Sequence, residues 1–178
     1  VVILLAHPNI KESQANKALV DAVSDMEGVA VFNLYELSQE IAFNIDEWSK
    51  IISDASAVIY QFPFYWMSAP SLLKKWQDEV FTFLSKTPAV AGKPLTVVTT
   101  TGSEYEAYRS GGRNRFTTDE LLRPYQVSAI HSGMSWQTPI VVYGMGTADA
   151  GKNIAEGANL YKQRVEMLIG SSNAGNNW

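Results

Sequence analysis

The stretch QFPFYWMSAPSLLKKW, residues 61–76, places several aromatic side chains between prolines, directly after the apolar run Ala57–Tyr60. Aromatic side chains pack into a core by default, but a turn at the edge of a sheet has little core to fill. We therefore expect Trp66 and its neighbours to form one wall of a slot. Backbone N–H groups along 64–67 would then face the polar edge of a flat heterocycle such as an isoalloxazine ring.

A second segment, AHPNIKESQANK over residues 6–17, follows another apolar run. Ser13 is a natural N-cap for the helix that begins there, and Asn16 lies in its first turn. Free N–H groups at a helix start together with a Ser hydroxyl can bind a phosphate. An N-cap behind an extended loop explains the same residues, and a lone histidine such as His7 is more often structural.

The third segment, TTTGSEYEAY over residues 99–108, brings small residues to the end of a further apolar run. Thr100, Thr101, Gly102 and Ser103 permit close approach of a planar ligand to the backbone. A turn alone also explains Gly102. Each segment is a weak signal, and together they favour a planar, phosphorylated ligand.

Alternating strands and helices position these three segments. Apolar β-rich runs predict strands over 1–5, 29–34, 57–62, 95–101 and 139–143, and three- and four-residue spacing predicts helices over 14–26, 46–53, 71–84, 118–129 and 148–169. Such an order predicts a parallel sheet covered by helices on both faces. Ligands bind beyond the carboxyl ends of such strands, where the three segments lie. We expect one domain over 1–170 and a flexible tail over 171–178.

Composition removes several classes of function. A net charge of −4 disfavours nucleic acid as a partner, and the absence of cysteine excludes disulfides, iron–sulfur clusters and thiol catalysis. With two distant histidines we expect no metal site. No apolar run reaches the ~18 residues of a membrane span, and we expect a cytoplasmic protein.

Other sequence motifs give little information about function. There is no GxxxxGK[ST] and no GxSxG, which disfavours a P-loop nucleotide hydrolase and a serine hydrolase. Gly144 and Gly146 lack the context of a dinucleotide fingerprint. Arg109, Arg113 and Arg115 could meet a dinucleotide phosphate or form a solvated loop face.

The sequence resembles the NAD(P)H:quinone oxidoreductase-like flavodoxin-fold family. Within it, the chain is most similar to small bacterial NAD(P)H oxidoreductases that include ancillary flavoproteins of glutathione-gated potassium-efflux systems. The similarity runs through LLAHPNIKESQANK, NLYEL, FNID, YQFPFYWMSAPSLLKKWQDEVF, AGKPLTVVTTTG and LYKQR, nearly the whole chain. Its most specific parts are QFPxxWxxxPxxLKxW and HPxxxxSxAN.

The resemblance implies a flavodoxin-like three-layer α/β/α sandwich with a five-stranded parallel sheet of order 2-1-3-4-5. It also implies a homodimer with one flavin per subunit near the interface, FMN being our expectation and FAD the alternative. Flavin contacts carry over to residues at both ends of the site: His7, Ser13, Gln14, Ala15 and Asn16 on the phosphate side, and Phe64, Tyr65, Trp66, Met67, Thr100, Thr101, Gly102 and Ser103 on the ring side.

Two departures from the family concern catalysis. In the mammalian-type quinone reductases a Tyr, and a His six residues later, stabilise the charge of the reduced flavin. Tyr108 matches the Tyr, but Asn114 stands where the His would be, so Tyr108 is only a candidate catalytic residue. The segment 82–92 is also shorter and lacks the tyrosines of their quinone pocket.

The function implied is two-electron, ping-pong transfer from NAD(P)H to a quinone or related electrophile, with the flavin doing the chemistry. A regulatory ancillary subunit of a potassium-efflux system, held at the inner membrane through its partner, is one alternative. A flavodoxin-like electron carrier is another, although such carriers are typically more acidic than this chain.

Overall fold

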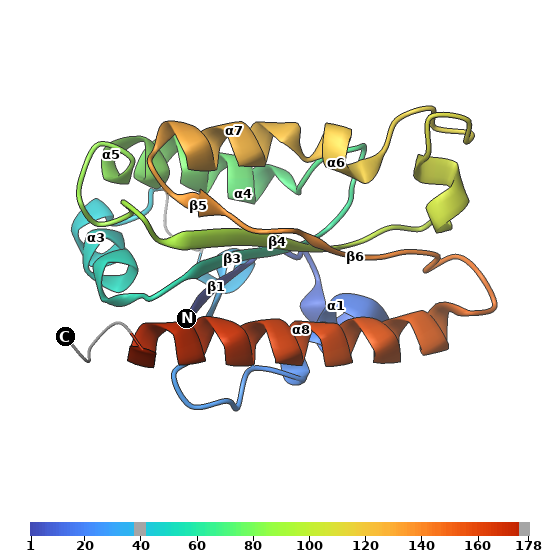
Figure 1. The fold of residues 1–178 in the computed structure, drawn as a ribbon, viewed down its shortest axis with the longest axis horizontal. Helices are drawn as coiled ribbons and strands as arrows, with labels where there is room; N and C mark the ends of the chain where they lie inside the picture. The colour runs from blue at the N-terminus through green and yellow to red at the C-terminus, as the bar shows by residue number, and fades with distance from the viewer. Residues whose placement is uncertain (38–41, 175–178) are drawn as a thin grey trace.

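The structure, a computed structural model, describes residues 1–37 and 42–174. Five parallel strand positions form one sheet in the order 2-1-3-4-5, as expected: β2 (Ala30–Asn33), β1 (Val2–Leu5), β3 (Val58–Pro63) and β4 (Pro94–Thr100), then β5 (Ser135–Trp136) and β6 (Ile140–Val142) (Figure 1). β5 and β6 both pair with β4 and share the fifth position. The expected strand over 139–143 therefore corresponds to β6 alone.

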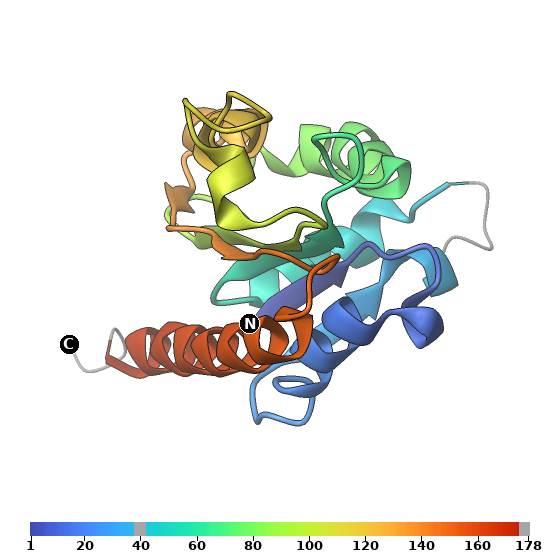
Figure 2. The same ribbon diagram turned by 90° about the vertical axis from the view of Figure 1, so that its right-hand side faces the viewer.

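Helices cover both faces of the sheet and complete the expected three layers. On one face lie α1 (Gln14–Asp21) and α8 (Ala150–Ala174), and the opposite layer contains α3 (Ile45–Asp54), α4 (Ser71–Trp76) and α7 (Arg123–His131) (Figures 1 and 2). Short helical segments lie between them: η1 (Ile10–Glu12), α2 (Leu34–Leu37), η2 (Gln77–Phe81), α5 (Thr82–Leu84), η3 (Tyr105–Tyr108) and α6 (Thr118–Leu121).

Strand residues alternate between the two layers. Val2 and Leu4 pack into the α3–α4–α7 core, whereas Ile3 packs against α1 and α8. This alternation explains why β1 is a continuous apolar run, since both of its faces are buried. None of the described helices combines the length and apolar character that a bilayer span requires.

Several helices differ in form or bounds from the prediction. The helix predicted over 14–26 ends earlier, because α1 spans only Gln14–Asp21. The helix predicted over 71–84 is continuous but contains a π-helical turn, η2. The one predicted over 118–129 divides at Leu122 into α6 and α7, because Pro124 lacks the N–H that would continue it. α8 continues to Ala174 rather than ending at Ile169. The division into a domain and a tail over 171–178 stays a prediction, and residues 175–178 lie outside the described residues.

Gly157 lets α8 approach β6 closely, and we expect Gly157→Ala to destabilise the protein. A Cβ atom on Gly157 would lie 2.4 Å from Cγ2 of Val142, a stiff, β-branched side chain. Overpacking of this kind costs about 1–3 kcal/mol. Gly151, in the same helix, has open space where a Cβ atom would lie. Gly151→Ala should therefore raise the free energy of unfolding by up to about 1 kcal/mol. Urea unfolding of both variants checks the contrast, and equal stabilities would contradict the close packing.

Candidate functional site

A cavity of about 300 Å³ lies at the carboxyl ends of the strands, the end that faces the viewer in Figure 2. It is lined by the loops after β1, β3 and β4, together with the loop after β6 and the start of α8: His7, Ser13, Gln14, Ala15, Asn16, Pro63, Phe64, Tyr65, Thr100, Thr101, Gly102, Met145, Ala150 and Ile154. The three segments singled out from the sequence therefore meet, as expected. Its volume is at the lower end of the roughly 300–1,000 Å³ usual for ligand pockets.

Three predicted contacts are not among the lining residues, namely Trp66, Met67 and Ser103, and four lining residues were missed. One of the four is Pro63, the last residue of β3. Met145, Ala150 and Ile154 come from the chain after β6. The segment after β6 also begins at the carboxyl edge of the sheet. Its position in the topology could therefore have indicated that it lines the cavity.

One end of the cavity is formed by the start of α1. Ser13 caps this helix, its Oγ accepting a hydrogen bond of 3.1 Å from the N–H of Asn16. The N–H groups of Gln14 and Ala15 have no intramolecular partner among the described residues, as is usual in a first helical turn. The first turn of α1 carries no acidic residue. The cavity thus has free donors and a positive helix end, which suit an anion.

His7 adds a neutral donor to this end. Its Nδ1 accepts a 3.1 Å hydrogen bond from the N–H of Asn9, so in the neutral imidazole the proton lies on Nε2. Burial lowers the pKa of His7. The side chain is therefore uncharged at neutral pH and can donate from Nε2.

Asn16 contributes an acceptor that lacks a partner. Its side chain is only 1% exposed, and its Nδ2 donates to Oγ1 of Thr100 at 3.0 Å. The amide of Gln61 donates to the Asn16 carbonyl at 2.8 Å. Oδ1 of Asn16, however, has no hydrogen-bond partner. Buried polar atoms are nearly always paired, so a hydroxyl of a bound molecule would satisfy this oxygen.

The aromatic segment forms a strained tight turn at the other end of the cavity. Tyr65 and Ser68 exchange two backbone hydrogen bonds, of 2.8 and 3.0 Å, across Trp66 and Met67. These two central residues have φ of 46° and 62°, a left-handed turn that usually takes Asn and Gly. Strain of this kind collects at functional sites.

The turn presents both surface and donors to its surroundings. The side chain of Trp66 is 97% exposed. The N–H groups of Trp66 and Met67 have no intramolecular partner within the described part of the chain. Tyr65 lines the cavity, with its ring centroid 6.5 Å from that of His7. Stacking surface and free donors therefore occur on one turn, but Trp66 does not line the cavity, so the wall that the sequence predicts is formed there by Tyr65 and Phe64.

Tyr108 lies behind the ring side of the cavity. Its ring is buried and packs edge-on against Phe64, with centroids 6.1 Å apart. Burial raises the pKa of the phenol, and Arg113 and hydrogen-bonding contacts with Thr101 and Asn114 partly offset that rise. Asn114, at the position of the relatives' His, thus contacts the phenol. Tyr108 remains protonated at neutral pH.

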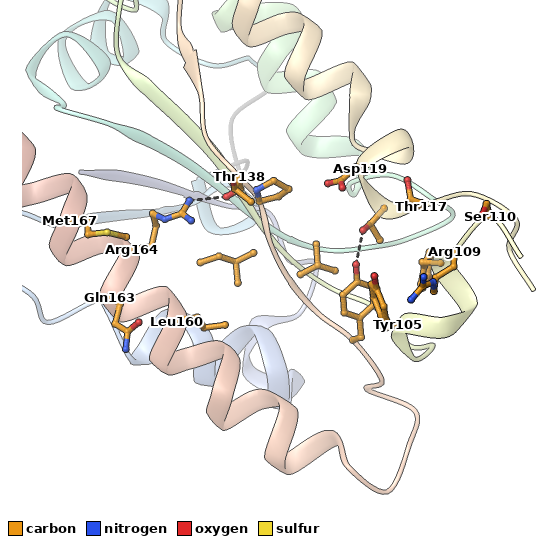
Figure 3. Close-up of a pocket in the computed structure, with 16 residues that line it drawn as sticks. Tyr105, Arg109, Ser110, Thr117, Asp119, Thr138, Leu160, Gln163, Arg164 and Met167 are labelled. Atoms are coloured by element: carbon orange, nitrogen blue, oxygen red, sulfur yellow. Dashed lines mark hydrogen bonds between the residues drawn. The ribbon is translucent and has the colours of Figure 1, made fainter. Parts of the chain in front are cut away.

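The larger cavities outside this site include two of about 590 Å³ each. One is a groove between α7 and the continuous helix of α4, η2 and α5. The other lies between β6, α8, η3 and α6, with Tyr105 and Arg109 toward one end and Arg164 and Met167 toward the other (Figure 3). Within the described ranges, no three potential metal ligands among His, Cys, Asp and Glu cluster together.

Comparison with known proteins finds similarity along most of the chain. Residues 1–165 match the family model described as flavodoxin-like fold. The uncharacterised NAD(P)H oxidoreductase YdeQ of Bacillus subtilis (strain 168) is 34% identical over 171 residues, which cover 94% of this chain and 86% of YdeQ. The glutathione-regulated potassium-efflux system ancillary protein KefG of Serratia proteamaculans (strain 568) is 36% identical over 147 residues, 80% of each chain.

A similar solved structure is that of general stress protein 14 from Treponema denticola, described as a complex with FMN. It superposes with a TM-score of 0.84 at 29% sequence identity, covering 94% of this chain and 98% of that one. The similarity therefore extends to the backbone that forms the cavity.

Proposed function

Because the chain belongs to the flavodoxin-like fold family, we propose that it is an FMN-dependent NAD(P)H oxidoreductase that reduces quinones or related electrophiles by two electrons. The observation that carries the proposal is the cavity with a free helix start at one end and the strained aromatic turn at the other. A phosphate at the first end and a flat ring at the second would place a flavin across it.

The residues present fit FMN. Gln14, Ala15 and His7 would donate to the phosphate, and the orphan Oδ1 of Asn16 would accept from a ribityl hydroxyl. The N–H groups of Trp66 and Met67 would donate to the polar edge of the ring. The Treponema denticola relative, described with FMN, supports this choice over FAD. The proposed contacts also include Ser13, Phe64, Tyr65, Thr100, Thr101, Gly102 and Ser103.

The protein's part in the reaction is binding and positioning. FMN, when bound, would supply the redox chemistry, accepting a hydride from a nicotinamide and delivering two electrons to an acceptor. Trp66 and Tyr65 would wall the space in which donor and acceptor bind in turn, so we expect ping-pong kinetics. Tyr108, protonated and held by Asn114 and Thr101, is the candidate for holding a proton beside the ring.

A second candidate function is favoured by one finding. KefG, an ancillary protein of a potassium-efflux system by name, is 36% identical to the chain. The protein would then bind a membrane potassium-efflux partner, with any reductase activity secondary. We also propose that the protein is a homodimer in the cytoplasm, which is compatible with both functions.

The experiment that tests the proposal follows the colour of the protein. The protein reconstituted with FMN should be yellow, bleach when NADPH is added without oxygen, and recover its colour when a quinone follows. Protein that binds FMN but does not bleach with NADPH or NADH would favour the ancillary function instead. Failure to bind any flavin would overturn the site.

A further inference from the structure

The loop 109–115, which follows η3, is a folded structure that carries three arginines: Arg109 lines the larger cavity of Figure 3, and Arg113 contacts Ser103. The N–H of Gly112 donates to the carbonyl of Arg109 at 2.9 Å, and the N–H of Asn114 donates to that of Ala107 at 3.0 Å. A Cβ atom on Gly112 would lie 2.1 Å from the Glu106 carbonyl oxygen. The loop is thus packed onto η3 at a point where only glycine fits, and its side chains project from a defined backbone.

Arg113 links this loop to the candidate flavin site. Its Nη2 donates to Oγ of Ser103 at 2.5 Å, and Thr101, which lines the cavity, donates to the Ser103 carbonyl. The guanidinium also interacts electrostatically with the Tyr108 phenol. The charge of Arg113 therefore lies near Ser103 and Tyr108, outside the residues that line the cavity.

Arg109 lies over an aromatic surface. Its guanidinium carbon is 5.3 Å from the ring centroid of Tyr105, which is 48% exposed. Tyr105 packs edge-on against Tyr143, whose hydroxyl lies 2.6 Å from Oγ1 of Thr118. This supported tyrosine and Arg109 form one end of the larger cavity shown in Figure 3. An exposed ring beside a guanidinium suits a purine base.

The arginines are not neutralised by the protein. None of Arg109, Arg113 and Arg115 forms an ion pair with a carboxylate within the described ranges. Asp119 lines the same cavity and Glu104 lies near Tyr108, but neither makes such a pair. In a chain of net charge −4, guanidinium groups on one loop that pair with no carboxylate favour the approach of an anion. Guanidinium groups bind phosphate in a bidentate manner.

We propose that Tyr105, Arg109 and Arg113 bind the adenosine 2′-phosphate half of NADPH and so make the enzyme prefer NADPH to NADH. The inference rests on the proposed function, because it needs a nicotinamide dinucleotide at the flavin. It adds residues that hold the far end of that dinucleotide, and it makes Arg109 and Arg113 determinants of specificity rather than catalytic residues.

Binding of 2′,5′-ADP and of 5′-AMP, measured by isothermal titration calorimetry, tests the inference without any turnover. The wild-type protein should bind 2′,5′-ADP at least tenfold more tightly than 5′-AMP. Arg109→Gln with Arg113→Gln should weaken 2′,5′-ADP binding at least tenfold and weaken 5′-AMP binding less, because only 2′,5′-ADP carries the 2′-phosphate, whereas both nucleotides carry the purine beside Arg109. Arg123→Ala, an exposed arginine outside the loop, is the matched control and should bind both like the wild type.

Two results would overturn the inference: equal affinity of the wild type for the two nucleotides, or unchanged 2′,5′-ADP binding in the double variant. Arg113→Lys keeps the charge and should retain part of the preference, and a thermal melt of each variant shows that it is folded. FMN titration of the same samples separates the two proposals. FMN binding without discrimination between the nucleotides rejects only this inference, whereas loss of FMN binding in the wild type rejects the flavin site.

Discussion

A Ser13→Asp variant is expected to fold with wild-type stability and to bind FMN at least about 100-fold more weakly. Aspartate caps helices about as well as serine, so the bond that Ser13 makes to the Asn16 N–H can be kept. Its carboxylate, however, would lie beside the proposed phosphate. Two unit charges about 5 Å apart repel by roughly 3 kcal/mol at an effective dielectric constant of about 20. Quenching of FMN fluorescence on titration with protein measures the change.

Riboflavin and a neutral cap provide the controls for this prediction. Riboflavin has no phosphate, so its affinity should be the same for Ser13→Asp and the wild type. Ser13→Asn caps the helix without adding a charge and should bind FMN nearly as well as the wild type. Two results would show that the phosphate does not lie at the start of α1. Ser13→Asp would bind FMN as tightly as the wild type, or its affinity for riboflavin would fall as much as its affinity for FMN.

Replacing Trp66 and Met67 by Asn and Gly should stabilise the protein and weaken flavin binding. Both residues have positive φ, a conformation that costs roughly 1–2 kcal/mol for an ordinary L-residue. Asn-Gly is the preferred pair for such a turn, so the free energy of unfolding should rise by about 1–3 kcal/mol. The backbone donors stay in place, but the stacking surface is lost. We expect riboflavin and FMN affinity to fall together, by about tenfold or more.

The pattern across ligands distinguishes this variant from Ser13→Asp. The turn variant should lose both flavins equally, whereas the charge at residue 13 should affect only FMN. Urea unfolding checks the gain in stability. A turn variant that is less stable than the wild type, or that binds riboflavin unchanged, would show that the exposed Trp66 serves another purpose.

The sequence predicts the sheet well because its strands are buried on both faces. Continuous apolar runs such as Val1–Leu5 and 57–62 are read directly as central parallel strands. β5 is missed because two residues give no periodic signal. The π-helical turn η2 is missed because its residues keep a helical apolar pattern. The bounds of β5 and β6 and the break between α6 and α7 at Leu122 depend on the local backbone geometry near prolines, which apolar periodicity does not show.

The site is predictable where topology determines it. Loops after β1, β3 and β4 must meet at the carboxyl edge, which explains why Ser13, Phe64 and Thr100 lie together. The sequence does not show that Trp66 and Met67 adopt positive φ, because neither is a residue type that favours it. It also gives no sign that Arg113 reaches Ser103, a contact between residues ten positions apart that depends on the fold of the loop.

A crystal structure of the protein grown with FMN tests the central claim most directly. We expect one FMN per chain, with its phosphate accepting hydrogen bonds from the N–H groups of Gln14 and Ala15 and its ring against the turn of Tyr65–Ser68. A ribityl hydroxyl should lie within hydrogen-bond distance of Oδ1 of Asn16. FMN bound instead in the cavity beside Tyr105 and Arg164, or no FMN at all, would contradict the account.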